Sequence, residues 1–453
     1  MPDLIESASL PDGVIHAHDF GAVGDGAADD TAAIQAAIDA CTSRVASDGR
    51  GVVRLATGVY RSGTLRLRDR VTLMLEAGAT LRGHEDPEAY SGCRPQGKMS
   101  ARWYRGLIVA EDTQDAGVCG PGTIDGRKLN DPLGEERMRG PHTVLAARST
   151  GFSIRDLAIT DSANYAIMIV NCDDTDVDRV TVTGGWDGLH ARGNPDKSCQ
   201  RLAVTGCRFF TGDDAIAGCW VDDLLVRDCL LNSSCNGIRW IGPARRMIVD
   251  SCLIFGPGRH PHRTQGRHNA LIGVTLQPSA WEPMPGDLDE IRLTNLTMHR
   301  VMSPMMVVAH PLNRIGSIDA RRITATGVYG PACSFESWSD RPIERIVLSD
   351  VDIDFDLTGP DAAHAVHPLT PGEQIAQPRV GSRALPAWAL YARRVNHLDL
   401  RDVRLHHTQA VAAPAIRCDG VESLEHYGLR LPAGIATPDA IQRCGLDEAV
   451  TKR

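Results

Sequence analysis

Three acidic residues beside glycine recur in the middle of the chain and could together support acid–base chemistry. Asp187 precedes a glycine, and the pair Asp213 and Asp214 follows Gly212. Asp187 and Asp213 are 26 residues apart, and Asn236 comes 23 residues after Asp213. Cleaving a glycosidic bond needs one group that protonates the leaving oxygen and one that activates water, and two carboxyl groups usually do this. We therefore take Asp187, Asp213 and Asp214 as the candidate catalytic group.

Short apolar segments recur at nearly the same interval and indicate how these acids are positioned. Leu202, Leu224 and Met247 begin three such segments. A repeat of 20–50 residues with one short strand per repeat is typical of a solenoid of stacked coils. In a parallel β-helix, equivalent positions on successive coils are about 4.8 Å apart. We therefore expect an all-β fold of roughly ten coils in which the three acids and Asn236 share one outer face.

The two ends of the chain carry different patterns from the coils. We expect a single domain with a leader at 1–18, an N-terminal cap at 19–45, coils at 46–431 and a tail at 432–453. The cap should contain a helix that begins at Asp30 or Thr31 and closes the open end of the solenoid. The tail holds a short amphipathic segment, Pro438 to Cys444, which we expect to be a second cap. The apolar stripe of the N-terminal helix would consist of Ile34, Ala37, Ile38 and Cys41.

Composition excludes several classes of partner. The net charge is −9 and there is no basic block, so we expect no nucleic-acid partner. We find no signal-peptide pattern and no run of 18 apolar residues, so we expect a cytoplasmic protein without a membrane partner. The 13 cysteines include no CxxC. Cys207, Cys229 and Cys252 recur at the repeat interval and predict a stack of buried thiols rather than disulfides or a metal site.

Three segments resemble the polygalacturonase-type enzymes of glycoside hydrolase family 28. They are DFGAVGDGAADDTAAIQAAIDAC at 19–41, GVVRLATGVYRSGTLRLRDRVTLMLEAGATLRG at 51–83 and GPGTIDGR at 120–127. The similarity extends from about residue 19 to about residue 298. It implies a right-handed parallel β-helix of the pectin-lyase type and inverting hydrolysis of a carbohydrate substrate without a cofactor or a metal. By resemblance, Asp213 is the acid, while Asp187 and Asp214 hold the attacking water.

The chain departs from the family pattern at two motifs. The family's Gly-His-Gly falls at 235–237, where Asn236 replaces a histidine and cannot carry a proton. The family's Arg-Ile-Lys, which grips a uronic carboxylate, falls near 273–277, where Thr275 and Gln277 replace both cations. This favours a neutral or differently charged glycoside over plain polygalacturonate. The cations that could substitute are Arg239, Arg245 and Arg246.

Other polar and aromatic residues near the motifs are candidate sugar contacts. We expect the rings of Trp186 and Trp240 to stack on sugar, and we disregard a zinc site at His260, His262 and His268 because their spacing is irregular and no acid is nearby in sequence. The Pro-rich segments 255–287 and 358–387 should wall the groove, which would favour exo-action on short oligosaccharides. The remaining predicted substrate-binding residues are His190, Asn236, Arg239, Gln277 and His310.

Two other functions remain open from the sequence. One is a polysaccharide lyase or epimerase on the same fold, which needs a basic Arg or Lys and often calcium held by acids. The other is a carbohydrate-binding β-helix without catalysis. The sequence also leaves open the sugar, the linkage and the oligomeric state, a homo-oligomer included.

Overall fold

The protein is described from a computed structural model that covers residues 14–44, 49–95, 99–269, 272–359, 365–370, 373–407, 411, 413–432 and 440–445. These residues group into two compact units. The first unit comprises Met1–Asn164 and Cys172–Val180, and the second comprises Tyr165–Asn171 and Thr181–Arg453. The single domain expected from the sequence stays a prediction.

The first unit is built of short parallel strands whose side chains alternate between the interior and the surface. In β3 and β6, every second residue is buried, which is the two-residue period of a strand with one buried face. One set of its strands consists of β1 (Val14–His16), β2 (Asp25–Asp29), β3 (Gly51–Leu55), β4 (Gly58–Ser62), β6 (Val71–Leu75), β7 (Ala79–Gly83), β9 (Gly117–Cys119), β10 (Thr123–Asp125), β12 (Ser153–Arg155), β13 (Ala158–Thr160) and β15 (Asp173–Asp178). The other set consists of β5 (Leu65–Arg66), β8 (Gly106–Glu111) and β11 (His142–Ala147).

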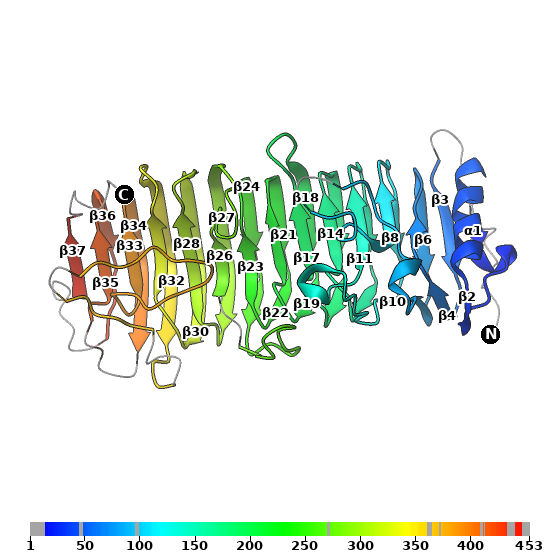
Figure 1. Ribbon diagram of the computed structural model, residues 1–453. Helices are drawn as coiled ribbons and strands as arrows, with labels where there is room; N and C mark the ends of the chain where they lie inside the picture. The colour runs from blue at the N-terminus through cyan, green and yellow to red at the C-terminus, as the bar shows by residue number, and fades with distance from the viewer. Residues whose placement is uncertain are drawn as a thin grey trace, which may run out of the picture. The chain divides into compact units, whose positions relative to one another are not determined.

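The N-terminal cap contains the predicted helix, but the predicted leader includes a strand that belongs to the fold. Helix α1 (Thr31–Arg44) lies beside β3 (Figure 1). The predicted apolar stripe, Ile34, Ala37, Ile38 and Cys41, is completely buried. The carboxylate of Asp30 accepts hydrogen bonds from the backbone N–H groups of Val23 (2.6 Å) and Gly24 (3.2 Å), so it ties the glycine-rich loop to the start of the helix. Within the predicted leader, β1 pairs in parallel with β3, because Ile15 adds an apolar side chain to the core.

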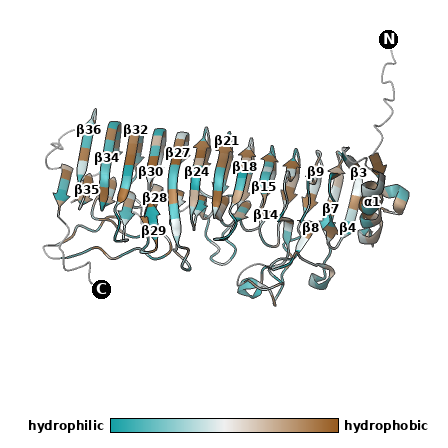
Figure 2. Cartoon of the chain, turned by 90° about the horizontal axis from the view of Figure 1, so that it is seen from above, coloured by the Kyte–Doolittle hydropathy of each residue, from teal (hydrophilic) through white to brown (hydrophobic). Residues whose placement is uncertain are grey.

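The second unit is built in the same way and contains the candidate site. Its strands carry alternating polar and apolar bands (Figure 2). The strands of one set are β16 (Thr181–Thr183), β18 (Cys199–Thr205), β19 (Arg208–Thr211), β21 (Val221–Arg227), β22 (Leu230–Ser233), β24 (Ala244–Asp250), β25 (Leu253–Phe255), β27 (Gly286–His299), β29 (Asn313–Ile315), β30 (Ser317–Val328), β32 (Ile343–Phe355), β34 (Val395–His407) and β36 (Ser423–Tyr427). We call the other set the site sheet: β14 (Ile167–Val170), β17 (Leu189–Arg192), β20 (Ile216–Cys219), β23 (Asn236–Trp240), β26 (Ile272–Leu276), β28 (Ser303–Ala309), β31 (Cys333–Ser337), β33 (Leu390–Arg393), β35 (Ile416–Asp419) and β37 (Ile441–Cys444).

These parallel sets confirm the right-handed parallel β-helix class, but the number of coils is larger than expected. The described part of the second unit alone has ten strands in the site sheet, and the first unit has three more in the corresponding set. The prediction of roughly ten for the whole chain was too low. The loops after Phe255 and Phe355 differ in length from the earlier ones, which disrupts the triplet spacing used for counting.

The thiols that recur at the repeat interval form the predicted buried stack. Cys207, Cys229 and Cys252 are each at most 3% exposed. The thiol of Cys229 donates toward the carbonyl of Val204 on the preceding coil (3.6 Å). Its hydrogen bond with Cys207, together with burial, raises the pKa of Cys229 to about 12. These cysteines are core residues of the coils, as expected.

The C-terminal tail differs from its prediction where it is described. Residues Ile441–Cys444 form strand β37, which pairs in parallel with β35 and therefore adds a strand to the site sheet. Pro438 and residue 439 of the predicted amphipathic segment lie outside the described residues. Among the helices that are described, none combines the length and the apolar character that a membrane crossing requires.

Candidate active site

Three polar residues stack on successive coils where strands β17, β20 and β23 of the site sheet begin. In the register of β17, β20 and β23, Leu189 is paired with Ile216, which is paired with Ile238. Two residues earlier on each coil lie Asp187, Asp214 and Asn236. Backbone hydrogen bonds continue the ladder there, from Gly188 N–H to the Asp214 carbonyl and from Ala215 N–H to the Asn236 carbonyl, both 3.0 Å. The predicted alignment of these residues on one face is confirmed.

A bend in the chain before β20 brings the side chains of Asp213 and Asp214 to the same face of the site sheet. In an extended strand, adjacent side chains would point to opposite faces. Here the hydroxyls of Thr211 and Ser233 donate to the backbone carbonyl of Asp213, at 2.8 and 2.5 Å, and hold the bend. Carboxylate oxygens of Asp187, Asp213 and Asp214 then lie within 4.8 Å of one another. The three predicted catalytic residues therefore form one cluster.

The three carboxylates differ in exposure and in partners. The Asp213 side chain is 15% exposed, against 4% for Asp187 and 7% for Asp214. The most open carboxylate is therefore the one that the resemblance assigns as the acid. Asp187 lies 2.8 Å from Nδ1 of His190, whose ring stacks on Tyr165 with a centroid distance of 4.6 Å. His190 is buried and orients Asp187, and its predicted sugar contact stays a prediction.

Asp214 is held by the residue that replaces the family histidine. Asn236 donates to Oδ1 of Asp214 from its backbone N–H (3.1 Å) and from its side-chain amide (2.6 Å). The hydroxyl of Thr275 donates to Oδ1 of Asn236 (3.1 Å). The two departures from the family pattern are therefore in contact with each other. The Asn236 amide is bonded within the site, and its predicted sugar contact stays a prediction.

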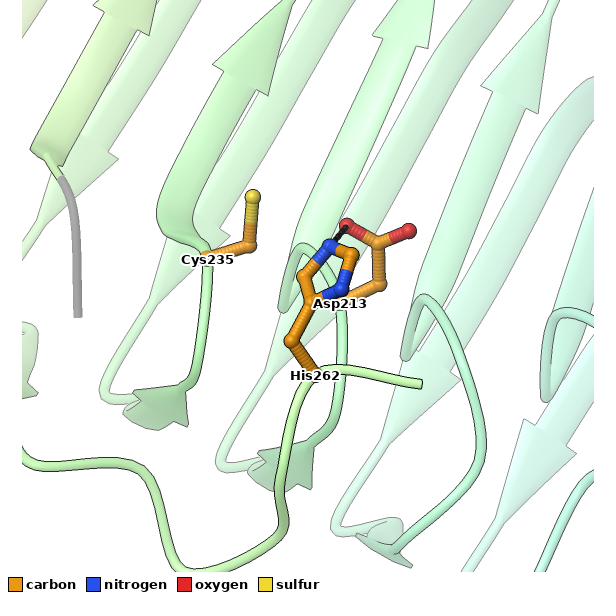
Figure 3. A group of neighbouring side chains, drawn as sticks. All are labelled: Asp213, Cys235 and His262. Carbon is orange, nitrogen blue, oxygen red and sulfur yellow. Dashed lines mark ion pairs between the residues drawn. The ribbon is translucent and has the colours of Figure 1, made fainter. Parts of the chain in front are cut away.

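A histidine that sequence analysis disregarded lies beside Asp213. Nε2 of His262, from the loop after β25, is 3.7 Å from Oδ1 of Asp213, and the two side chains face each other (Figure 3). No acid is near His262 in sequence, but coiling brings His262 to Asp213, which is 49 positions earlier. Motif spacing carried no signal for this contact, since the loop interrupts the repeat.

The Cys235 thiol also faces this pair. The side-chain ligand atoms of Asp213, Cys235 and His262 lie within 4.8 Å of one another, and these residue types occur in zinc sites. Burial, with Asp214 and Asp213, raises the pKa of Cys235 well above its ordinary value. A thiolate, not a thiol, is the form that binds metal. The absence of a metal stays a prediction.

The aromatic residues expected to stack on sugar are in the wrong place for it. Trp186 and Trp240 are 1% and 0% exposed, so neither indole presents a face to solvent. The exposed indole is Trp281, at 64%, and the guanidinium of Arg239 lies 5.3 Å from its ring centroid. Arg239 is also 3.6 Å from Oδ2 of Asp214, so it lies between the acids and Trp281.

A cavity of about 550 Å³ opens next to Trp281. One wall is the loop after β26, and the other is a segment that we call the strap, residues 373–385. Its lining residues are Ser279, Ala280, Trp281, His310, Gln377, Pro378, Arg379 and Val380. Both predicted wall segments therefore contribute to one cavity. His310 lines it, and its contact with substrate stays a prediction.

Gln277 holds the strap and does not line the cavity. Its amide donates to the backbone carbonyl of Arg379 (2.6 Å), and its side chain is completely buried. The predicted sugar contact of Gln277 stays a prediction. On the strap, Gln377 lies 2.7 Å from Nδ1 of His310. Arg383 forms two hydrogen bonds with the buried carboxylate of Glu336, at 3.0 and 2.6 Å.

Of the three cations considered as replacements, only one lies at the site. Arg239 is on β23 of the site sheet. Arg245 and Arg246 are exposed on β24, a strand of the other set, and Arg246 pairs with Asp223 (2.5 Å). Arg379 lines the cavity and was not considered from the sequence.

The parallel β-helix and its cluster of carboxylates are the features expected of a polygalacturonase-type protein. Comparison with known proteins finds relatives of this type. A family model described as rhamnogalacturonase A/epimerase, pectate lyase-like, matches residues 14–81. An endo-polygalacturonase of Pectobacterium parmentieri is 25% identical over 209 residues, covering 41% of this chain and 50% of that protein. A polygalacturonase of Malus domestica is 22% identical over 377 residues, covering 77% and 76%.

The fold has a close match among solved structures. The exopolygalacturonase of Thermotoga maritima aligns with a TM-score of 0.62 and 19% identity, covering 76% of this chain and 88% of that one. This likeness shows the fold alone. The chain spans about half the length of the Pectobacterium relative that it matches. The resemblance to family 28 polygalacturonase-type proteins of the pectin-lyase fold is therefore confirmed, and the relatives are glycosidases.

Proposed function

We propose that the protein is a glycoside hydrolase that acts on a pectin-type oligosaccharide. The observation that carries this proposal is the cluster of Asp187, Asp213 and Asp214, whose oxygens lie within 4.8 Å of one another. Three acids that face one point exceed what turns between strands require. Their placement on two rigid, adjacent coils suits chemistry that depends on fixed geometry.

The three carboxylates take separate roles in this proposal. Asp213, the most exposed, protonates the leaving oxygen. Asp187 and Asp214, which occupy equivalent positions on adjacent coils, hold the attacking water and accept its proton. A water that donates to two oxygens at about 2.8 Å each fits between atoms separated by up to about 5.6 Å, so the observed separation suits this arrangement.

We propose inversion at the anomeric carbon, as the resemblance implies. Inverting enzymes with two carboxyls usually separate them by roughly 6.5–9.5 Å, and retaining ones by roughly 5–5.5 Å. The limit of 4.8 Å here refers to the nearest oxygens and is short for inversion. The site differs from the usual pair because two acids, Asp187 and Asp214, are assigned to the water, and His190 and Asn236 each hold one of them.

The strap supports action from the chain end. It crosses beside the cavity and is tied down at Gln277, His310 and Glu336. A sugar chain bound across the acids would meet this wall near Trp281, so a terminal sugar would occupy the cavity. Trp281 offers a face for stacking on the ring, and Arg379 offers a cation.

Plain polygalacturonate is not the substrate that this site suits best. Thr275 and Gln277, which stand where the family has two cations, are buried and bonded to Asn236 and Arg379. A uronic carboxylate at that position would find no Arg or Lys there. We therefore propose a pectin-type glycoside in which the sugar at this position is neutral or differently charged.

The test is a screen of neutral and uronic oligosaccharides, including rhamnogalacturonan fragments, with Asp213→Asn as the inactive control. Release of reducing sugar that disappears in the variant is expected. Release of an unsaturated product that absorbs ultraviolet light and stops with EDTA would instead identify a lyase. Binding without cleavage, unchanged in Asp213→Asn, would identify a carbohydrate-binding protein.

A further inference from the structure

We propose that His262 supplies, from the loop after β25, the imidazole that is missing at position 236, and that it acts as the positioning partner of the acid Asp213. This inference rests on the proposed function. It goes beyond the family pattern, because the ring comes from a different coil and approaches a different carboxylate from the one that Asn236 holds.

Position 236 cannot serve Asp213 in this chain. The Asn236 amide donates to Asp214 and its oxygen accepts from Thr275, so both ends of the side chain are used. The residue before it, Cys235, contributes a thiol whose pKa burial raises well above its ordinary value. A thiol is a weak hydrogen-bond donor. The imidazole of His262 is the stronger donor beside Asp213.

The loop that carries His262 is anchored to the coil that precedes it. The side-chain amide of Asn232 donates to the carbonyls of Phe255 and Pro257, both at 2.9 Å, and its oxygen accepts from the N–H of Arg259 (2.7 Å). One residue of β22 therefore fixes the first part of the loop with three hydrogen bonds. The hydroxyl of Ser234 donates to the carbonyl of His260.

The loop is also closed on itself at His262. The backbone N–H of His262 donates to the carbonyl of Arg267, and its carbonyl accepts from Gly266, both at 2.8 Å. The N–H of Gly258 donates to the carbonyl of His268 (2.6 Å). These bonds fix the backbone at His262, so the position of its main chain does not depend on the contact between its ring and Asp213.

Contacts with the coil of Asp213 and with the adjacent coil of Asp187 hold the loop beside Asp213. The guanidinium of Arg259 lies 4.2 Å from the ring centroid of Phe210, and that of Arg263 lies 5.7 Å from Trp186. The carbonyl of Pro261 lies 2.7 Å from where a Cβ on Gly212 would be. The residue next to His262 therefore packs on the residue next to Asp213.

The two ring nitrogens of His262 have different environments, which determine which of them carries the hydrogen in the neutral ring. Nδ1 lies 3.4 Å from the N–H of Thr264 and 3.2 Å from its hydroxyl. When Nδ1 accepts from this N–H, the neutral ring carries its hydrogen on Nε2, which faces Asp213. At 3.7 Å the contact is longer than a hydrogen bond, and catalytic hydrogen bonds commonly shorten when substrate binds.

This arrangement assists proton transfer from Asp213. When Asp213 gives its proton to the leaving oxygen, the proton departs with the alcohol and Asp213 becomes a carboxylate. The Nε2–H of His262 then donates to that carboxylate, while the proton of the attacking water passes to Asp187 or Asp214. A fixed donor aimed at a charge that develops in the transition state lowers the barrier.

The test compares His262→Leu and His262→Gln with the matched variant His268→Leu. His268 is on the same loop and its ring lies 2.9 Å from the carbonyl of Gly258, so its loss perturbs the loop without removing the donor at Asp213. We expect kcat to fall by about 10²-fold in His262→Leu with KM little changed, and by less than about 10-fold in His262→Gln, which keeps an N–H. His268→Leu should stay near wild type.

The pH profile separates this role from a purely structural one. Loss of the Nε2–H donor disfavours the Asp213 carboxylate, so the alkaline limb of kcat should move to higher pH in His262→Leu. The other charged or titratable groups around the pair are Asp187, Asp214, Cys235, Arg239 and Arg263, and the variants leave them unchanged. His268→Leu should keep the wild-type limb.

Two results would overturn the inference alone. One is a His262→Leu variant with wild-type kcat in an enzyme that Asp213→Asn inactivates. The other is an equal loss in the three variants with no movement of the limb, which would make the loop merely structural. If the wild-type protein cleaves no substrate in the screen, the proposed function fails first, and the inference fails with it.

Discussion

Asn236 donates two hydrogen bonds to a single oxygen of Asp214. Its backbone N–H and its amide reach Oδ1 at 3.1 and 2.6 Å. Thr275 sets the orientation of this amide by donating to its oxygen, which turns the NH₂ group toward Asp214. The position that carries a histidine in the family thus serves here to hold one of the two acids that we assign to the water.

We expect Asn236→Ala to lower kcat/KM by about 10-fold or more. The variant removes a hydrogen bond to a charged group, which contributes roughly 1.5–3 kcal/mol, while the backbone N–H still holds Asp214. Asn236→Asp should be worse, since it places a like charge beside Asp214. Thr275→Val should show a smaller loss, because the amide can then turn. Steady-state kinetics on the substrate found in the screen measures the series, and wild-type activity in Asn236→Ala would contradict it.

Asp213→Asn should lose about 10²–10⁴-fold in kcat and keep its fold. An amide cannot give a proton to the leaving oxygen, and general acid catalysis typically contributes this factor. Asp222→Asn is the control, since Asp222 lies on β21 in the set of strands opposite the site sheet. Circular dichroism should show the same spectrum for both variants. Equal activity of Asp213→Asn and Asp222→Asn would remove Asp213 from the mechanism.

The first product formed should have the inverted anomeric configuration. Water held by Asp187 and Asp214 attacks the face opposite the leaving group in a single displacement. Proton NMR of the product in the first minutes, before mutarotation, gives the configuration directly. A retained configuration would assign one of these acids as a nucleophile, which the short oxygen separation would then explain.

Releasing the strap should change the length of the products. Arg383→Met removes both hydrogen bonds to Glu336 and leaves a completely buried carboxylate without this cation. Such a loss typically costs about 3–5 kcal/mol, and replacing both partners by Met should restore part of it. Products from a labelled oligomer should shift from short end fragments to mixed lengths. An unchanged product pattern, with the variant folded, would show that the strap does not set end-wise action.

His310 should make stability depend on pH. Burial lowers the pKa of His310 below 6.5, although Glu336 opposes the shift. As the pH falls below 6.5, the unfolded chain takes up this proton before the folded one does, so stability falls with decreasing pH until the folded pKa is reached. Urea midpoints at pH 5 and pH 8 should differ more in the wild type than in His310→Gln. Equal differences in the two proteins would contradict this account.

Periodicity predicted the fold and the alignment of the acids, because both depend on local spacing. One apolar triplet per coil is enough to predict stacking, and stacking alone brings Asp187, Asp214 and Asn236 together. The boundary of the predicted leader was wrong because β1 is only three residues long. Its partner β3 lies beyond the helix in the sequence, so local spacing does not reveal the pairing. Short apolar segments of this kind have no period to detect.

Side-chain direction could not be predicted in the same way. Trp186 and Trp240 lie in the motifs but are buried, whereas Trp281 lies in an irregular loop and lines the cavity. Gln277 and His190 were predicted to contact sugar, whereas their side chains contact the strap and Asp187. The contact of His262 with Asp213 depends on how a loop folds back over an earlier coil, and no repeat pattern describes that.

Gly212 leaves no room for any other residue. A methyl group there would lie 2.6 Å from the carbonyl of Gly185 and 2.7 Å from that of Pro261, both of them main-chain atoms that cannot rotate away. A single added carbon would therefore displace both the turn before Asp187 and the segment that carries His262 from the coil of Asp213. Gly212→Ala should thus test, with one added carbon, whether catalysis requires the present contact between Asp213 and the His262 ring.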